Sequence, residues 1–92
     1  MSEQVIDNTA ARRFELAMAG GTAFIAYRRS GATLLLEHAE VPAALGGRGL
    51  GTRLVRETLE LIRSRGERMV PACSFIRSFV DRHPEYADLC PP

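Results

Sequence analysis

The sequence predicts one small α/β domain over residues 1–92, with elements in the order β-β-β-α-β-α and a mixed sheet. The first half alternates apolar and polar residues between turn signals, which is typical of antiparallel strands. A glycine-rich segment then leads into an amphipathic helix, and one short apolar strand follows that helix. A strand, a helix and another strand join parallel neighbours, so we expect antiparallel pairing on one side of the sheet and parallel pairing on the other.

Three strands are expected before the glycine-rich segment. They cover residues 13–19, 22–29 and 32–41. Gly20-Gly21 and Ser30-Gly31 supply the turns between them, because such dipeptides favour tight turns. The run Leu34-Leu35-Leu36 predicts that the third strand is buried on both faces. Pro42 ends this strand, since proline has no N–H to donate to a neighbouring strand.

The second half predicts two helices with a short strand between them. The first helix, residues 50–65, has apolar side chains at helical spacing and is followed by the stop signal Gly66. A short strand is expected at 68–72. A second helix is expected over 74–82, with Ser74 as its N-cap. The tail after this helix is expected to be irregular.

Composition limits the classes of function. Hydrophobic residues make up 46% of the chain and charged residues 25%, with a formal net charge of +1. This balance fits a soluble globular protein, and the lack of a basic excess argues against nucleic acid as the main partner. The chain has no lysine, which excludes the lysine of a P-loop. No apolar run could span a membrane and MSEQVIDN lacks a secretory pattern, so a cytoplasmic protein without a membrane partner is expected.

Residues 41–55, VPAALGGRGLGTRLV, place four glycines within six residues at the start of the first helix. A helix N-terminus offers unpaired N–H groups and a partial positive charge, and glycines let an anion approach the backbone. No acidic residue lies between Glu40 and Glu57, while Arg48 and Arg53 fall in this stretch. These features favour a bound anion. A flexible connection that binds nothing is the alternative that the segment alone leaves open.

The two commonest phosphate-binding motifs do not fit this segment. Thr52 stands where a P-loop needs lysine and where the dinucleotide pattern needs its last glycine. The run from Gly46 to Gly51 instead resembles the Q/R-x-x-G-x-G/A signature of the GNAT superfamily of acetyl-CoA-dependent N-acetyltransferases. Gly49 and Gly51 are the two signature glycines, and Gly46 replaces the usual Gln or Arg.

The resemblance extends over most of the chain, from about Phe14 to Leu89. The runs EHAEVP, GGRGLGTRLV, VPACSFIRSFV and RHPEYADL together look like the minimal single-domain GNAT-like family. This likeness implies a minimal GNAT-type fold in which the strand before the glycines splays from the next strand. It implies acetyl-CoA as cofactor, with the pantetheine arm between the splayed strands and paired with the backbone of Val41. The pyrophosphate-binding residues it implies are Gly47, Arg48, Gly49, Leu50, Gly51 and Thr52.

Three side chains are candidates for the chemistry. Cys73 directly precedes the second helix, whose dipole favours a thiolate, and the resemblance makes it a catalytic group or acetyl acceptor. The alternative for Cys73 is a buried structural cysteine. His38 and Glu40 share one face of the third strand, so either could take a proton from an amine. The alternatives are a packed sheet histidine and a solvated strand-end carboxylate.

The remaining side chains near the second helix carry weaker indications. Phe75 and Phe79 are four residues apart and are expected to pack in the core, the alternative being a platform for the cofactor. Tyr86 follows the helix where some GNAT enzymes keep a tyrosine that protonates the leaving thiolate. Cys90 is expected to be an incidental thiol, and with only two isolated cysteines no metal site is predicted.

The function predicted from these residues is transfer of an acetyl group from acetyl-CoA to an amine, which is either a small molecule or part of a protein. One alternative is a non-catalytic module of the same fold that binds coenzyme A or an acyl-CoA. Another is an interaction scaffold whose glycine segment binds nothing. A monomer or a weak homodimer is expected.

Overall fold

A computed structural model describes residues 4–46 and 49–92 and contains one five-stranded sheet in the order β1-β2-β3-β4-β5. The strands are β1 (Ile6–Asn8), β2 (Arg13–Met18), β3 (Gly21–Ser30), β4 (Thr33–Glu40) and β5 (Arg68–Pro71). Neighbouring strands from β1 to β4 pair antiparallel, whereas β5 pairs parallel to β4. The predicted α/β class and mixed sheet are therefore confirmed.

The short strand β1 was not predicted, and long-range contacts explain why it forms. The buried carboxylate of Asp7 accepts hydrogen bonds from the Tyr27 hydroxyl (2.7 Å) and from Arg65 (2.8 Å). The backbone N–H of Val5 donates to the carboxylate of Glu57 in the first helix (3.0 Å). These partners lie far away along the chain, so no local pattern marks the strand.

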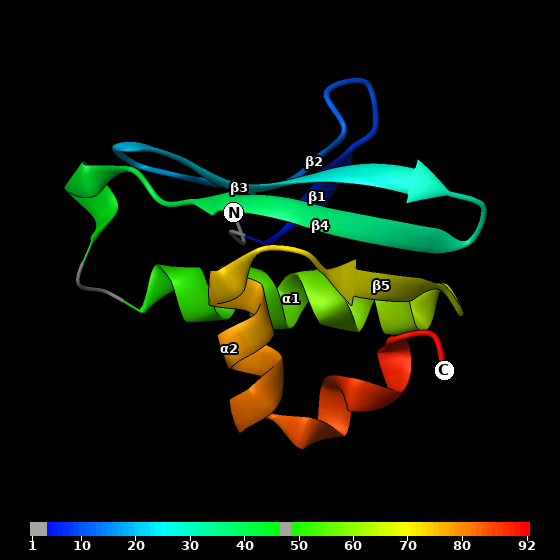
Figure 1. The fold of residues 1–92 in the computed structure, drawn as a ribbon. Coiled ribbons are helices and arrows are strands. Elements are labelled where there is room, and N and C mark those ends of the chain that lie inside the picture. The colour runs from blue at the N-terminus through cyan, green and yellow to red at the C-terminus, as the bar shows by residue number, and fades with distance from the viewer. Residues whose placement is uncertain (1–3, 47–48) are drawn as a thin grey trace.

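The helices lie on one face of the sheet, as Figure 1 shows. They are α1 (Leu50–Ser64) and α2 (Ser74–Arg82), with short 3₁₀ helices η1 (Ala43–Leu45) and η2 (Pro84–Leu89). Helix α1 packs against β2, β3 and β5, and α2 packs against β4 and β5. Among residues 4–46 and 49–92, no helix has the length and apolarity to cross a lipid bilayer.

The element ends differ from the prediction by at most one residue, and two further features differ as well. Cys73, not Ser74, is the N-cap of α2. The tail that was expected to be irregular contains η2, whose Tyr86 and Leu89 are buried against the rest of the core. Apolar burial therefore orders a segment that has no helical periodicity of its own.

The core lies between the sheet and the helices. Its fully buried side chains include Phe14, Leu16, Ile25, Leu34, Leu36, Leu54, Leu59, Ile62, Met69, Ile76 and Phe79. Leu35 is only half-buried because no helix covers the opposite face of the sheet (Figure 1). The prediction that this strand is buried on both faces was wrong. We call the opposite side the uncovered face of the sheet.

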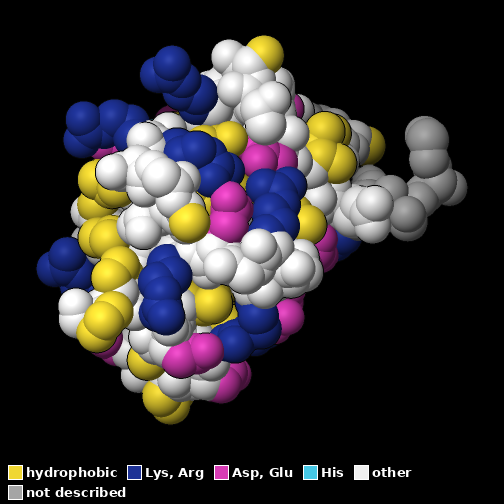
Figure 2. All heavy atoms as spheres, turned by 90° about the vertical axis from the view of Figure 1, so that its right-hand side faces the viewer, with side chains coloured by type: hydrophobic (Ala, Val, Ile, Leu, Met, Phe, Trp, Pro, Cys, Tyr) yellow, Lys and Arg dark blue, Asp and Glu magenta, His cyan; other side chains and the backbone are white. Residues whose placement is uncertain are grey.

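Arginines and acidic residues are interspersed over the surface seen in Figure 2. Many of them form ion pairs between elements, for example Arg29–Glu67 (2.6 Å) and Arg63–Asp88 (2.9 Å). The arginines of these pairs are partly solvent-exposed, so each pair contributes little to stability. The ion pairs of the described residues involve Arg13, Arg28, Arg29, Arg53, Arg63 and Arg65.

The edge strand β5 leaves β4 about halfway along β4. Their pairing ends at Leu36 and Pro71, and the Leu36 carbonyl accepts hydrogen bonds from the N–H groups of Ala72 (3.0 Å) and Cys73 (3.1 Å). The chain then turns into α2, while β4 continues to Glu40 paired only with β3. The structure therefore leaves an open backbone edge on the last part of β4.

Candidate functional site

A pocket of about 280 Å³ lies where β4 leads into α1. Its lining residues are Val41, Leu45, Gly46, Gly49, Leu50, Gly51, Thr52 and Phe75. We call it the glycine pocket. It brings together Val41, Gly49, Leu50, Gly51 and Thr52, which were all predicted to bind the cofactor. Gly47 and Arg48, the other two predicted residues, lie outside the described residues.

The N-terminus of α1 opens into this pocket without a side-chain cap. Gly49 is the N-cap and has φ of 67°, a left-handed conformation that glycine adopts without strain. Among the described residues, no side-chain cap hydrogen bond is made at this helix start, and the first turn, from Leu50 onward, contains no acidic residue. The unpaired N–H groups and the helix dipole therefore make this end suitable for an anion.

Two residues near the start of α1, Gly51 and Arg53, have contacts that bear on the glycine pocket. A Cβ atom on Gly51 would lie 2.9 Å from Cζ of Phe75, so a larger side chain would displace the ring. Arg53 falls in the stretch that was predicted to bind an anion, and its Nε donates to Glu57 (2.6 Å), in the ion pair that i,i+4 spacing on a helix predicts.

Cys73 lies at the point where β5 leaves β4. It is partly buried against the core, and its carbonyl accepts the hydrogen bond of the Arg77 N–H in the first turn of α2 (2.9 Å). Its own N–H reaches the carbonyl of Leu36, the last β4 residue that pairs with β5. The backbone of Cys73 therefore lies beside the start of the open edge of β4, directly before α2.

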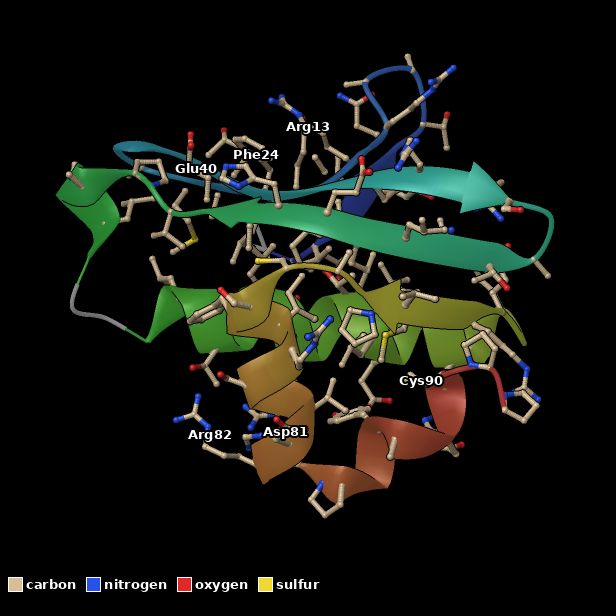
Figure 3. All side chains as sticks on the ribbon, viewed as in Figure 1. Arg13, Phe24, Glu40, Asp81, Arg82 and Cys90 are labelled. Atoms are coloured by element: carbon tan, nitrogen blue, oxygen red, sulfur yellow. The ribbon has the colours of Figure 1, made fainter. Side chains whose placement is uncertain are left out.

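His38 and Glu40 share one surface, as predicted, and their side chains are 58% and 59% exposed. His38 Nε2 lies 3.3 Å from Glu40 Oε1. Both lie on the uncovered face, where the ring of Phe24 is 6.0 Å from the His38 ring. Figure 3 shows Glu40, Phe24 and Arg13 together on this side of the sheet. A carboxylate and an imidazole in contact form a group that can accept a proton.

A bulge in β4 determines which way these two side chains point. Ala26 pairs with His38 and Tyr27 with Leu36, so Glu37 is an extra residue in β4. Without the bulge, His38 and Glu40 would share the face of the buried Leu34 and Leu36. Nothing in the local sequence indicates this bulge.

The family model for GCN5-related N-acetyltransferases matches residues 13–89, which include β2 to β5 and both α-helices. This chain belongs to the GCN5-related N-acetyltransferase family. The match confirms the resemblance drawn from the glycine segment and from the flanking runs. The family model covers the whole glycine pocket, Cys73, His38 and Glu40 within one continuous stretch.

One solved structure has the fold of this GCN5-related N-acetyltransferase. It is the NMR solution structure of a GCN5-like protein from Staphylococcus aureus, with a TM-score of 0.71 and 23% sequence identity. The likeness covers 99% of this chain and 91% of that chain. At this identity it supports the fold alone. The comparison with curated proteins gave no match.

Phe75 belongs to the site of this family member, although it was predicted to lie in the core. It is 42% exposed and lines the glycine pocket, whereas Phe79 is fully buried. The buried stripe of α2 consists of Ile76, Phe79 and Val80, and Phe75 lies about 100° around the helix from Ile76. The prediction for Phe75 relied only on its spacing of four residues from Phe79. The buried positions of α2, taken together, place Phe75 at the edge of the buried face of the helix.

The other candidates lie outside this site. Tyr86 is buried, and its hydroxyl donates to Glu60 of α1 (2.6 Å). Burial raises the pKa of Tyr86, and the hydrogen bond to Glu60 raises it further. Burial likewise raises the pKa of the partly buried Cys90 thiol. Within the part of the chain that the structure describes, no three His, Cys, Asp or Glu residues are grouped so that they could hold a metal ion.

Proposed function

We propose that residues 1–92 form one acetyl-CoA-binding domain that transfers an acetyl group to an amine. The observation that carries this proposal is the glycine pocket, because it joins an uncapped helix N-terminus to the open edge of β4. Family membership supports the same reaction class. Acetyl-CoA supplies an activated thioester when it is bound.

The pocket residues suit the parts of this cofactor. The N–H groups in the first turn of α1, including those of Gly51 and Thr52, are suited to the pyrophosphate oxygens. The backbone of Val41 and the end of β4 are free to pair with the amide groups of the pantetheine arm, as an added strand would. The absence of a Cβ on Gly51 lets the Phe75 ring pack close to the first turn of α1.

The side chains near the end of β4 have distinct proposed roles. An amine must lose a proton to attack a thioester, and Glu40 with His38 can accept that proton directly or through a water molecule. The departing thiolate must gain a proton, which the thiol of Cys73 can donate. Cys73 can alternatively accept the acetyl group itself before the amine does. The acceptor is either a small amine or an amine on a protein.

A binding module without turnover is the second candidate, and one observation favours it. Gly46 replaces the Gln or Arg of the family signature, and its backbone, with φ of −64°, does not require glycine. Release of the free thiol from acetyl-CoA in the presence of amines separates an enzyme from such a module.

Isothermal titration with acetyl-CoA tests the cofactor site. The natural protein is expected to bind. Gly51→Val is expected to bind at least tenfold more weakly, because the added isopropyl group would displace the Phe75 ring that lines the pocket. The control is Ala17→Val, which adds two methyl groups at an exposed strand position. Equal affinity of Gly51→Val and the natural protein, with both folded by circular dichroism, would contradict the proposed site.

A further inference from the structure

A second cavity, of about 410 Å³, lies where the turn between β1 and β2 meets the end of β3. Its lining residues are Thr9, Arg12, Tyr27, Arg28 and Arg29. We call it the arginine pocket. None of these described residues is acidic, although the chain as a whole has 12 basic and 11 acidic residues. Figure 2 looks onto this end of the molecule and shows arginine side chains gathered in its upper part, where the sheet lies.

The arginine pocket is separate from the glycine pocket and shares no lining residue with it among the described residues. Phe24 of β3 pairs with Glu40 at the end of β4 that leads to the glycine pocket, whereas Arg29 pairs with Leu34 near the other end. Five residues of extended strand separate Phe24 from Arg29, which is roughly 16 Å at about 3.3 Å per residue. In Figure 1 the turn between β3 and β4 and the start of α1 lie at opposite sides of the view.

Arg12 has a backbone conformation that a residue with a side chain rarely adopts. Its φ is 56°, and among residues 4–46 and 49–92 no other residue except glycine has a positive φ. A Cβ atom is strained in this left-handed conformation, which glycine adopts freely. Two backbone hydrogen bonds hold it, because the Arg12 N–H donates to Thr9 (3.2 Å) and the Arg12 carbonyl accepts from Tyr27 (3.0 Å). An arginine where glycine would fit better indicates a role for its side chain.

The three guanidinium groups of the pocket differ in how far they are already bonded. Arg12 has no hydrogen-bond, ion-pair or ring partner in the part of the chain that the structure describes. Arg28 bonds through Nε to Glu37 (2.6 Å), and its side chain is 68% exposed. Arg29 bonds through Nη1 to Glu67 (2.6 Å). Two carboxylates thus pair with two of the three arginines, and the uncompensated charge is that of Arg12.

We infer that the arginine pocket binds the phosphate group of a small ligand, which is either inorganic phosphate or a phosphate monoester. Guanidinium groups bind phosphate through two parallel hydrogen bonds, and the Thr9 hydroxyl can donate one more. One guanidinium occupies both oxygens of a carboxylate, whereas a phosphate has enough oxygens to accept from Arg12 and Arg28 together. The volume of the cavity is in the usual range for small-molecule sites. This inference does not depend on the proposed function.

Amide chemical shifts test the site during titration with inorganic phosphate or with phenyl phosphate, at an ionic strength held constant with sodium chloride. Saturable changes are expected at Thr9, Arg12, Arg28 and Arg29. The expected dissociation constant is about 1 mM or below, an affinity that a few charge-assisted hydrogen bonds can supply. Tighter binding of phenyl phosphate identifies a monoester as the ligand, and equal or weaker binding identifies free phosphate.

Two variants of Arg12 separate phosphate binding from a structural role. Arg12→Gly is expected to fold, because glycine adopts φ of 56° without strain. Arg12→Gln keeps a side chain of similar polarity without the charge. Both variants are expected to bind phosphate at least tenfold more weakly, because a guanidinium–phosphate pair is lost. Arg82→Gln removes the same charge at an exposed position of α2 outside the pocket, and this control is expected to keep the affinity.

Three results would overturn the inference. The first is unchanged phosphate affinity of the folded Arg12 variants. The second is a set of shifts that does not saturate, or that falls only on residues 49–52 at the start of α1. The third is competition between phosphate at the arginine pocket and acetyl-CoA, since the two sites are separate and the phosphate affinity is expected to stay the same when acetyl-CoA is present. Failure of acetyl-CoA to bind would contradict the proposed function and leave this inference standing.

Discussion

At the scale of single residues, Cys73 has the most chemically decisive position. It is the N-cap of α2, and its N–H is bonded to the last β4 residue that pairs with β5. A thiol at a helix N-terminus is favoured as a nucleophile, whereas a structural cysteine at the same place would be inert. The two roles predict different products.

Mass spectrometry after incubation with acetyl-CoA distinguishes these roles. We expect one acetyl adduct on Cys73, which is lost in Cys73→Ala and kept in Cys90→Ala. We expect Cys73→Ala to lower thiol release at least tenfold, with acetyl-CoA affinity unchanged. No adduct on the natural protein, together with full activity of Cys73→Ala, would show that Cys73 is structural.

At the scale of elements, two tyrosine hydroxyls connect segments that are distant in the chain. Tyr27 of β3 donates to Asp7 of β1 (2.7 Å), and Tyr86 of η2 donates to Glu60 of α1 (2.6 Å). Burial raises the pKa of each tyrosine, and the acceptor carboxylate raises it further. Both contacts therefore require the protonated phenol.

These shifts predict a loss of stability in alkali. A folded-state pKa above the unfolded value means that the stabilisation is complete below about pH 10 and is lost as the pH rises through the folded pKa values. The chain has no lysine, so few other groups titrate in this range. Urea unfolding between pH 9 and 12 (roughly the range of phenol ionisation) is expected to show a steeper loss for the natural protein than for Tyr27→Phe/Tyr86→Phe.

A control removes the contribution of the Cys90 thiol to the pH dependence of stability. Burial also raises the pKa of Cys90, which contributes a loss of the same sign at lower pH. The comparison is therefore made in a Cys90→Ala background. Identical pH profiles for the tyrosine variant and its parent in that background would show that the two hydrogen bonds carry no pH-dependent stability.

The same scale shows why the sequence predicts some elements and not others. Turn dipeptides and helical spacing are local, so they predict β2 to β4, α1, β5 and α2 to within a few residues. Strand β1 depends on Asp7 and Val5 meeting distant partners, and the bulge at Glu37 depends on pairing with β3. Such tertiary causes leave no local pattern.

The candidate site likewise has features that the sequence predicts and features that depend on tertiary packing. Glycines before a helix are recognisable from sequence, and the described ones line the glycine pocket. The exposure of Phe75 depends on how α2 rotates to bury Ile76 and Phe79. The ion pair of Arg53 with Glu57, in contrast, follows from their i,i+4 spacing on one helix, so the sequence predicts it.

At the scale of the whole molecule, a ligand can reach the open edge of β4 from either face of the sheet. The glycine pocket involves α1 and Phe75 of α2, and these helices cover one face of the sheet (Figure 1). Glu40 lies on the uncovered face (Figure 3), with His38 beside it. Between them, β4 and β5 diverge beyond Leu36. We therefore propose that the cofactor and the amine approach the open edge of β4 from opposite faces of the sheet.

The most direct test of acetyl transfer to an amine is to measure the release of free thiol from acetyl-CoA with a panel of amines. The natural protein is expected to release the thiol only when an accepted amine is present. Glu40→Gln is expected to lower kcat/KM about 10²-fold, the lower end of the usual range for a general base, with the affinity for acetyl-CoA unchanged. Tight binding of acetyl-CoA with no amine-dependent thiol release for any amine would contradict the account and leave a binding module of the same fold.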